Sequence, residues 1–142
     1  MAEEQTPASA QANKAAKQRI LVIEDDQFLG ELITMKLSKE NFDVTLATTG
    51  ADGLQKVEEL KPDIVLLDII LPEMDGFEVL KGIRSLSDTV TSQTPVILLS
   101  NLGQESNIER GLSLGAQDYL VKSNFTTDEI TKKVRETLAK EK

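Results

Sequence analysis

The chain contains no cysteine and no histidine, and its aromatic residues include no tryptophan and a single tyrosine. Without cysteine there are no disulfide bonds and no thiol chemistry, which is compatible with the cytoplasmic location that we expect. Without histidine the chain lacks the most common general base and the most common transition-metal ligand. Any transfer that passes through an imidazole therefore requires a second molecule.

Basic residues are also in short supply, since the net charge is −8 and the isoelectric point is near 4.6. A nucleic-acid partner held by a basic face is therefore not expected. No apolar run approaches the roughly 20 residues that a membrane helix needs, so we expect no membrane partner either. The 142 residues are 39% hydrophobic, which suits one core built from leucine, isoleucine and valine.

The chain divides into a polar beginning and a patterned remainder. Residues 1–18 are rich in alanine, glutamine, lysine and glutamate and lack the apolar centre of a signal peptide, so we expect a flexible N-terminal tail. A short docking helix is the alternative for this tail. Residues 19–142 are expected to form one domain. Nothing after Lys142 indicates an output domain, which favours a single module.

From residue 20 onward, short apolar runs alternate with segments of helical period. The pattern predicts strands at 20–23, 42–47, 64–67, 95–99 and 119–121. It predicts helices at 27–39, 51–60, from 77, before 115 and after a capping box formed by Thr126 and Glu129, with a loop at 85–94. Apolar residues recur at helical spacing in two of these helices and predict their apolar faces: Phe28, Leu29, Leu32, Ile33 and Leu37 in the first, and Ile108 and Leu112 in the helix before 115. Five βα units indicate an α/β protein with the doubly wound, flavodoxin-like (βα)5 fold, whose five-stranded parallel sheet has the order 2-1-3-4-5.

Polar side chains stand where four of these strands end. Glu24, Asp25 and Asp26 follow the first strand, Asp68 the third, Ser100 the fourth and Lys122 the fifth. The carboxyl ends of parallel strands meet at one edge of a sheet, which is where such folds bind ligands. Two carboxylates held close together repel by about 4 kcal/mol at an effective dielectric near 20, so they bind a proton or a cation. Mg²⁺ prefers such oxygen ligands.

Simpler roles exist for each of these residues. Asp26 is expected to cap the following helix rather than to join the site, whereas Asp25 is favoured as a site residue because Asp68 ends the neighbouring strand. Lysine side chains are usually solvated, and a serine often caps a helix, so Lys122 and Ser100 also have structural alternatives. Tyr119 could be plain core packing, and 72–76 could be only a turn.

The sequence resembles the receiver domain of response regulators, the CheY-like phosphoacceptor module of two-component signalling. The resemblance spans residues 19–139. It rests on Ile20-Leu-Val-Ile-Glu-Asp-Asp26, Ile64-Val-Leu-Leu-Asp-Ile-Ile-Leu-Pro-Glu-Met-Asp-Gly76, Pro95-Val-Ile-Leu-Leu-Ser100 and Gly115-Ala-Gln-Asp-Tyr-Leu-Val-Lys122. Each motif alone is weak evidence for this family, but all four in this order and at these separations are specific for it.

The resemblance implies a role for each site residue. Asp68 is the expected phosphoacceptor, Asp25 a direct Mg²⁺ ligand, Glu24 a ligand through water, and the Ile70 carbonyl the remaining protein ligand. Lys122 and Ser100 are expected to contact the phosphoryl oxygens, and Tyr119 to turn inward when Ser100 moves.

The resemblance also implies partners. A histidine kinase or a histidine phosphotransfer protein would supply the phosphoryl group, and a downstream protein would bind the switched face. The chain would be no enzyme beyond its own phosphorylation and slow dephosphorylation. It would be a monomer or a weak homodimer formed through the last two helices.

Three positions depart from the common family pattern. Ser123 follows the lysine where proline is usual, so a trans peptide bond is expected there, since a cis bond without proline costs about 3 kcal/mol. Asn101 replaces a small residue and is expected to hinder small phosphodonors. Ile70 and Leu102 are apolar at the positions two after Asp68 and two after Ser100, and neither can orient a hydrolytic water, so slow self-dephosphorylation is expected.

Other functions fit the sequence less well. A receiver-like binding module that signals without phosphorylation is the main alternative. Such modules usually lack one or more of the receiver site residues, which are the acidic residues after the first strand, the aspartate, the serine and the lysine, and this sequence has all of them. A haloacid-dehalogenase-type phosphatase needs a second aspartate where Ile70 stands. A flavodoxin-like FMN carrier needs a phosphate-binding loop after the first strand, which this sequence lacks.

Overall fold

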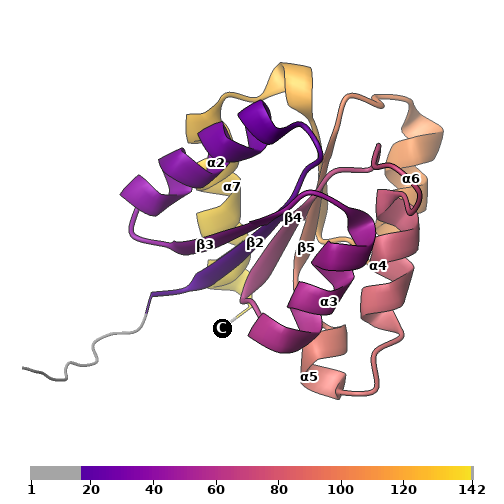
Figure 1. Ribbon diagram of the computed structural model, residues 1–142. Coiled ribbons are helices and arrows are strands. Elements are labelled where there is room, and N and C mark those ends of the chain that lie inside the picture. Colours follow the sequence, from indigo (N-terminus) through magenta and orange to yellow (C-terminus); the bar gives the residue numbers. More distant parts are fainter. Residues whose placement is uncertain (1–16, 142) are drawn as a thin grey trace, which may run out of the picture.

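A parallel sheet forms the centre of the protein (Figure 1). The computed structural model describes residues 17–141, so all but the last two residues of the expected tail lie outside the described part. The strands of the sheet are labelled β2 to β6 in chain order. Their spatial order, β3-β2-β4-β5-β6, is therefore the predicted order 2-1-3-4-5, in which the second strand of the chain lies at one edge. Strand bounds agree with the predicted ones to within one residue. The strands are β2 (Arg19–Ile23), β3 (Asp43–Ala47), β4 (Ile64–Leu67), β5 (Val96–Ser100) and β6 (Asp118–Val121).

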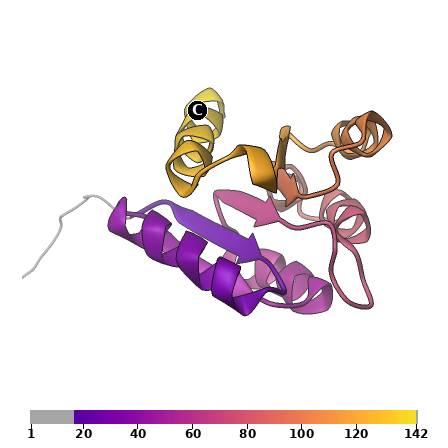
Figure 2. The same cartoon turned by 90° about the horizontal axis from the view of Figure 1, so that it is seen from above.

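Helices cover both faces of the sheet. One face carries α2 and α7, and the other carries α3, α4 and α6, as the two views agree (Figure 1, Figure 2). A 3₁₀ turn, η1 (Lys122–Asn124), follows β6. The helices are α2 (Gln27–Lys39), α3 (Gly50–Leu60), α4 (Gly76–Arg84), α5 (Thr89–Ser92), α6 (Glu105–Ser113) and α7 (Thr127–Lys140).

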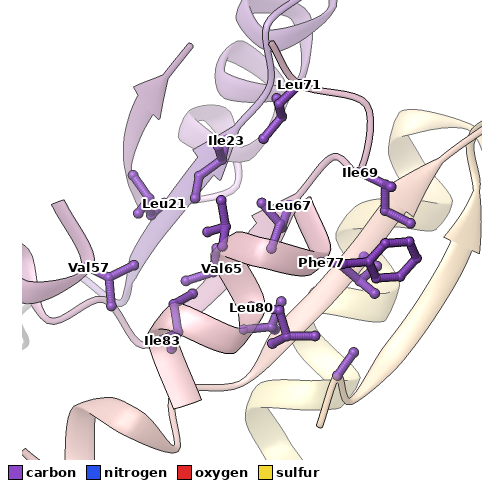
Figure 3. Packing of buried hydrophobic residues seen from close by; sticks show 14 of the residues in the cluster. Leu21, Ile23, Val57, Val65, Leu67, Ile69, Leu71, Phe77, Leu80 and Ile83 are labelled. Carbon is purple, nitrogen blue, oxygen red and sulfur yellow. The ribbon is translucent and has the colours of Figure 1, made fainter. Parts of the chain in front are cut away.

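The strands are apolar without interruption because both of their faces are buried. Leu21 and Ile23 of β2 pack toward α3 and α4, whereas Ile20 and Val22 pack toward α2 and α7. The same alternation divides β4 and β5 between two core clusters, one of which is shown in Figure 3. The described core thus consists of two layers separated by the sheet, which holds the strand ends in fixed positions.

Helix termini follow the local chemistry of the sequence. The predicted capping box of α7 is confirmed: the Thr126 hydroxyl accepts a hydrogen bond from the Glu129 N–H at 3.1 Å, and the Glu129 carboxylate accepts one from the Thr126 N–H at 2.8 Å. The loop predicted at 85–94 is wrong in part, because it contains the short helix α5. Asp88 caps α5 by accepting from the Val90 N–H at 3.1 Å.

The predicted apolar faces of α2 and α6 are partly wrong. Phe28 and Leu32, which share the apolar period of α2, are 73% and 40% exposed, and Leu112 of α6 is 46% exposed. Ile33 and Leu37 form the buried side of α2, and Gly111 is the buried residue of α6. Helical spacing groups residues on one face, but it does not show whether a neighbouring element covers that face.

Candidate functional site

The sheet register brings the four predicted strand ends together. Ile23 pairs with Leu67, so the residues that follow, Glu24 and Asp68, are neighbours across the strands. Ser100 pairs with Val121 on the other side of β4, and Lys122 comes next. The predicted gathering of these side chains at the carboxyl edge of the sheet is therefore what the backbone produces.

Three carboxylates form the acidic part of this site. Glu24, Asp25 and Asp68 each present an oxygen, and these oxygens all lie within 4.8 Å of one another. Glu24 and Asp68 are 2% and 5% exposed, whereas Asp25 is exposed to solvent. Two of the three carboxylates are therefore buried, and the site is open to solvent at Asp25.

Lys122 is the counter-charge of the two buried carboxylates. Its Nζ donates to Glu24 Oε1 at 2.7 Å and to Asp68 Oδ2 at 3.1 Å. The lysine side chain is 16% exposed, so its charge is only partly screened by water. One ammonium facing three carboxylates leaves the site with an excess of negative charge.

Burial and the neighbouring charges shift the pKa values of Glu24 and Lys122. Burial raises the pKa of Glu24 from 4.5 to about 7, against the lowering effect of the Lys122 hydrogen bond, and the charge of Asp68 raises the Glu24 pKa further. Burial lowers the pKa of Lys122, but the hydrogen bonds and charges of Glu24 and Asp68 outweigh burial and leave that pKa above its usual value. The lysine is therefore a permanent cation at neutral pH.

The donor set of the site fits a hard divalent cation. Carboxylate oxygens from Glu24, Asp25 and Asp68 are the ligands that Mg²⁺ takes, and the exposure of Asp25 leaves room for the waters that Mg²⁺ retains. A softer metal is disfavoured because no nitrogen or sulfur ligand is present in the cluster. The acidic cluster can therefore hold a metal ion of the kind predicted from the sequence.

Ser100 and Tyr119 are linked through the backbone of Leu102. Ser100 is fully buried, and its Oγ accepts a hydrogen bond from the Leu102 N–H at 3.2 Å. The Tyr119 hydroxyl donates to the Leu102 carbonyl, and the tyrosine is 7% exposed. Burial raises the pKa of Tyr119 above its ordinary value, partly offset by the neighbouring Ser100 hydroxyl. Tyr119 thus lies inward in this structure.

The remaining predictions have mixed outcomes. Asp26 caps α2 by accepting from the Leu29 N–H at 3.1 Å, as the simpler interpretation predicted. The Ile70 N–H donates to Asp68 Oδ1 at 3.3 Å while its side chain is 57% exposed. Asn101 is exposed beside Ser100. No peptide bond between residues 17 and 141 is cis, so the trans bond predicted before Ser123 is confirmed.

Gly76 helps to position the backbone of Asp68, although the sequence indicated only that it belongs to a turn. A Cβ built on it would lie 2.4 Å from the Asp68 carbonyl oxygen and 2.7 Å from the Ile69 Cα. The first residue of α4 therefore packs directly on the backbone that carries Asp68. In the sequence, this glycine follows the capping residue Asp75 at the end of the segment between β4 and α4, but its close approach to Asp68 is visible only in three dimensions.

Fold and site together define a doubly wound α/β domain that places a charged site at the carboxyl ends of its strands. The chain belongs to the response regulator receiver domain family, whose sequence profile matches residues 20–135. It is thus a receiver domain of the two-component type, a class of signalling module whose activity is that of a phosphoacceptor. Between residues 17 and 141, no helix is both long and apolar enough to span a membrane.

Curated relatives include transcriptional regulators. RpaA of Synechocystis sp., a DNA-binding dual master transcriptional regulator, is 38% identical over 120 residues, which are 84% of this chain and 48% of RpaA. MtrA of Mycobacterium tuberculosis, a DNA-binding response regulator, is 38% identical over 122 residues, which are 86% of this chain and 51% of MtrA. This chain therefore spans about half the length of these relatives.

Solved structures of receiver domains share the fold. The Francisella response regulator 1452 receiver domain has a TM-score of 0.80 at 31% identity and covers 89% of this chain and 100% of its own. A CheY-like receiver domain protein from Methanospirillum hungatei has a TM-score of 0.80 at 27% identity, with coverage of 88% and 96%. Both likenesses confirm the predicted flavodoxin-like architecture.

Proposed function

We propose that Asp68 accepts a phosphoryl group from a phosphohistidine on a histidine kinase or a histidine phosphotransfer protein, and that this modification switches a partner-binding face. The observation that carries the proposal is the contact of the Lys122 ammonium with both Asp68 and Glu24 beside an acidic cluster suited to Mg²⁺. The absence of histidine in the chain is consistent with an external donor.

The electrostatics of the site favour this reaction. A carboxylate that attacks a phosphoryl group approaches negative charge, so cations must neutralise the reacting atoms. Lys122 supplies one positive charge at Asp68. Glu24, Asp25, Asp68 and the Ile70 carbonyl would hold Mg²⁺, which when bound supplies the further charge neutralisation. Ser100, whose Oγ accepts from the Leu102 N–H, would donate its own O–H to a phosphoryl oxygen, and Tyr119 would respond to the movement of Ser100.

Chemical mapping of the phosphoryl group tests the proposal. The chain is incubated with Mg²⁺ and phosphoramidate, the resulting acyl phosphate is reduced with borohydride, and the modified residue is found by mass spectrometry. We expect modification at Asp68 and none in Asp68→Asn. Modification at another residue, or a parent chain that no phosphodonor labels, would favour the phosphorylation-independent binding module instead.

Asn101 is expected to slow labelling by small phosphodonors. Its side chain is exposed directly after the buried Ser100, and we expect it to narrow the approach to Asp68. We predict that Asn101→Ala is labelled several-fold faster by acetyl phosphate, measured as the initial rate of acyl phosphate formation. Asn107→Ala, a change of the same type on α6, serves as the control. An unchanged rate in Asn101→Ala would contradict the prediction.

The phosphoryl group is expected to persist on Asp68. Ile70 and Leu102 offer only hydrocarbon at the two positions from which a polar side chain could orient a hydrolytic water. We predict a phosphoryl lifetime of minutes or longer and a shorter lifetime in Ile70→Asn. Val90→Asn, at an 81% exposed valine on α5, should leave the lifetime unchanged. A half-life of seconds in the parent chain would disprove the prediction.

An apolar stripe on α2 supports a protein donor. Phe28, Leu32 and Met35 recur at helical spacing and are 73%, 40% and 54% exposed, and the helix begins three residues after Glu24. Asp68 is 5% exposed, so a protein that delivers a phosphoryl group must cover the surface around the opening of the site. Contiguous exposed apolar surface is one mark of a protein contact site, and these three side chains lie on one side of α2.

Removing an apolar residue from this stripe should separate the two kinds of donor. We predict that Phe28→Ser slows transfer from a histidine phosphotransfer protein by roughly tenfold, because one large apolar contact at an interface is worth 1–2 kcal/mol. Labelling by phosphoramidate should not change. Leu112→Ser, at an exposed leucine of α6, is the matched control. Equal slowing with both donors would mean that the variant damages the site itself.

A further inference from the structure

The ring of Tyr119 packs against a helix position that has no side chain. A Cβ built on Gly111 of α6 would lie 3.2 Å from Cδ2 of the Tyr119 ring and 2.4 Å from Cδ1 of Leu98. Both distances are shorter than ordinary van der Waals contact between carbon atoms. The side chains of Leu98 and Tyr119 therefore fill the space that a side chain at residue 111 would need.

The hydroxyl end of the same ring is held by the loop between β5 and α6. The Tyr119 hydroxyl donates to the Leu102 carbonyl, and the Leu102 N–H donates to Ser100 Oγ at 3.2 Å. One peptide segment thus connects the hydroxyl of Tyr119 to the hydroxyl of Ser100. The inward position of Tyr119 depends on two supports, the Leu102 carbonyl at the hydroxyl and the space beside Gly111 at the ring.

We propose that Gly111 is a positioning residue of the switch, because the space it leaves sets the balance between inward and outward positions of Tyr119. The inference rests on the proposed function, in which Tyr119 responds to phosphorylation through Ser100. The inference adds to the switch a residue that contacts neither Asp68 nor the residues expected to bind the phosphoryl group. Gly111 lies on α6, whereas the other residues of the switch lie in β5, β6 and the loop after β5.

A methyl group at residue 111 would lie 2.4 Å from Cδ1 of Leu98, which must move, and 3.2 Å from Cδ2 of Tyr119, a contact that is also too close. Leu98 is 0% exposed and pairs with Tyr119 across β5 and β6 in the same core cluster, so close packing lets its side chain move only toward the ring. Tyr119 is 7% exposed, on the edge strand β6, so rotation about its χ1 angle leads toward solvent. The tyrosine is therefore the side chain that yields, and overpacking by one methyl group corresponds to roughly a tenfold shift of the equilibrium toward the outward position.

The same shift should weaken the response to the phosphoryl group. If the modified site favours inward Tyr119, a substitution that favours outward Tyr119 must lower the affinity for a phosphoryl mimic, at most by the factor of the shift, because the affinity falls with the fraction of the inward state. Beryllofluoride is a suitable mimic, because a solved relative, the receiver domain of Klebsiella pneumoniae RstA at 31% identity and a TM-score of 0.75, is described as BeF3-activated.

The only tyrosine of the chain makes the test direct. Tyr119 is the sole tyrosine and there is no tryptophan, so tyrosine emission and the ¹⁹F resonance of a 3-fluorotyrosine-labelled chain both report on residue 119 alone. In Gly111→Ala without metal or phosphodonor, we expect stronger acrylamide quenching and a ¹⁹F shift toward the position seen in the denatured chain. Gly82→Ala is the matched control. A Cβ there would lie 2.8 Å from Cδ2 of Leu54, and all its nearest atoms belong to Leu54.

Each outcome decides the proposal. A folded Gly111→Ala chain with the quenching and ¹⁹F position of the parent overturns it. If Gly111→Ala does not fold, the double variant Gly111→Ala with Tyr119→Ala decides: recovery of the fold shows that the ring occupies the space, and no recovery shows that Leu98 is the obstacle and overturns the proposal. These measurements involve no phosphorylation, so a failure of Asp68 to accept a phosphoryl group would be seen separately, in the labelling experiment.

Discussion

Replacing Lys122 by methionine should lower the free energy of unfolding of the metal-free protein by about 2 kcal/mol or more near pH 8. The change removes the ammonium that contacts Glu24 at 2.7 Å and Asp68 at 3.1 Å, and both carboxylates are almost fully buried. Breaking a fully buried ion pair costs about 3–5 kcal/mol. The expected loss is smaller because Lys122 is 16% exposed and because Glu24 can take up a proton.

The size of this loss should depend on pH and on Mg²⁺. Since burial raises the pKa of Glu24 from 4.5 to about 7, the protonated form is favoured in the folded state; the stability linked to this group is complete below about pH 4.5 and is lost as the pH rises through about 7. Without Lys122 the Glu24 pKa should rise further, so the variant should be closer to the parent at about pH 5.5 than at about pH 8. Mg²⁺ should restore part of the stability at the higher pH.

Urea unfolding with and without Mg²⁺ measures this effect. Lys133→Met is the control, because Lys133 pairs with Asp118 at 3.8 Å on the surface, where both side chains are more than a third exposed. An exposed pair of this kind contributes about 0–1 kcal/mol, so the control should lose little stability and respond to Mg²⁺ as the parent does. If Lys122→Met loses no more than the control, the ammonium does not neutralise the buried carboxylates.

The architecture was predictable because the strands carry a strong signal. A strand buried on both faces must be apolar at every position, and the runs around Val65 and Leu98 have this property. The helix α5 was missed because four residues are too few for a periodic pattern, although Asp88 is a capping residue in the sequence. Exposure of Phe28 and Leu32 was missed because helical spacing is the same on a covered face and on an uncovered one.

The polar residues of the site were predictable from topology alone. Once the sheet is parallel, the residues after each strand must share one edge, which brings Glu24, Asp68 and Lys122 together. The space beside Gly76 and Gly111 was not predictable in this way. It depends on how closely α4 approaches the end of β4 and how closely α6 approaches β6, and no residue type in the sequence encodes those distances.

Replacing Gly76 by alanine should therefore damage both the fold and the phosphoacceptor. The added methyl group would lie 2.4 Å from the Asp68 carbonyl oxygen and 2.7 Å from the Ile69 Cα, and these are backbone atoms that cannot rotate away. The N–H of Gly76 also donates to the Ile69 carbonyl at 2.8 Å, which ties the start of α4 to the same segment. We expect a loss of about 3 kcal/mol in the free energy of unfolding, at the upper end for overpacking.

The displaced backbone carries Asp68, so labelling should fall by more than the loss of stability explains. Chemical denaturation gives the folded fraction, and labelling by phosphoramidate is then measured per folded molecule. Gly103→Ala is the control, because a Cβ there would meet only Val121 at 3.7 Å, an ordinary contact. A Gly76→Ala chain that is labelled at the parent rate per folded molecule would show that α4 can move away without shifting the end of β4, and the close approach would then matter for stability alone.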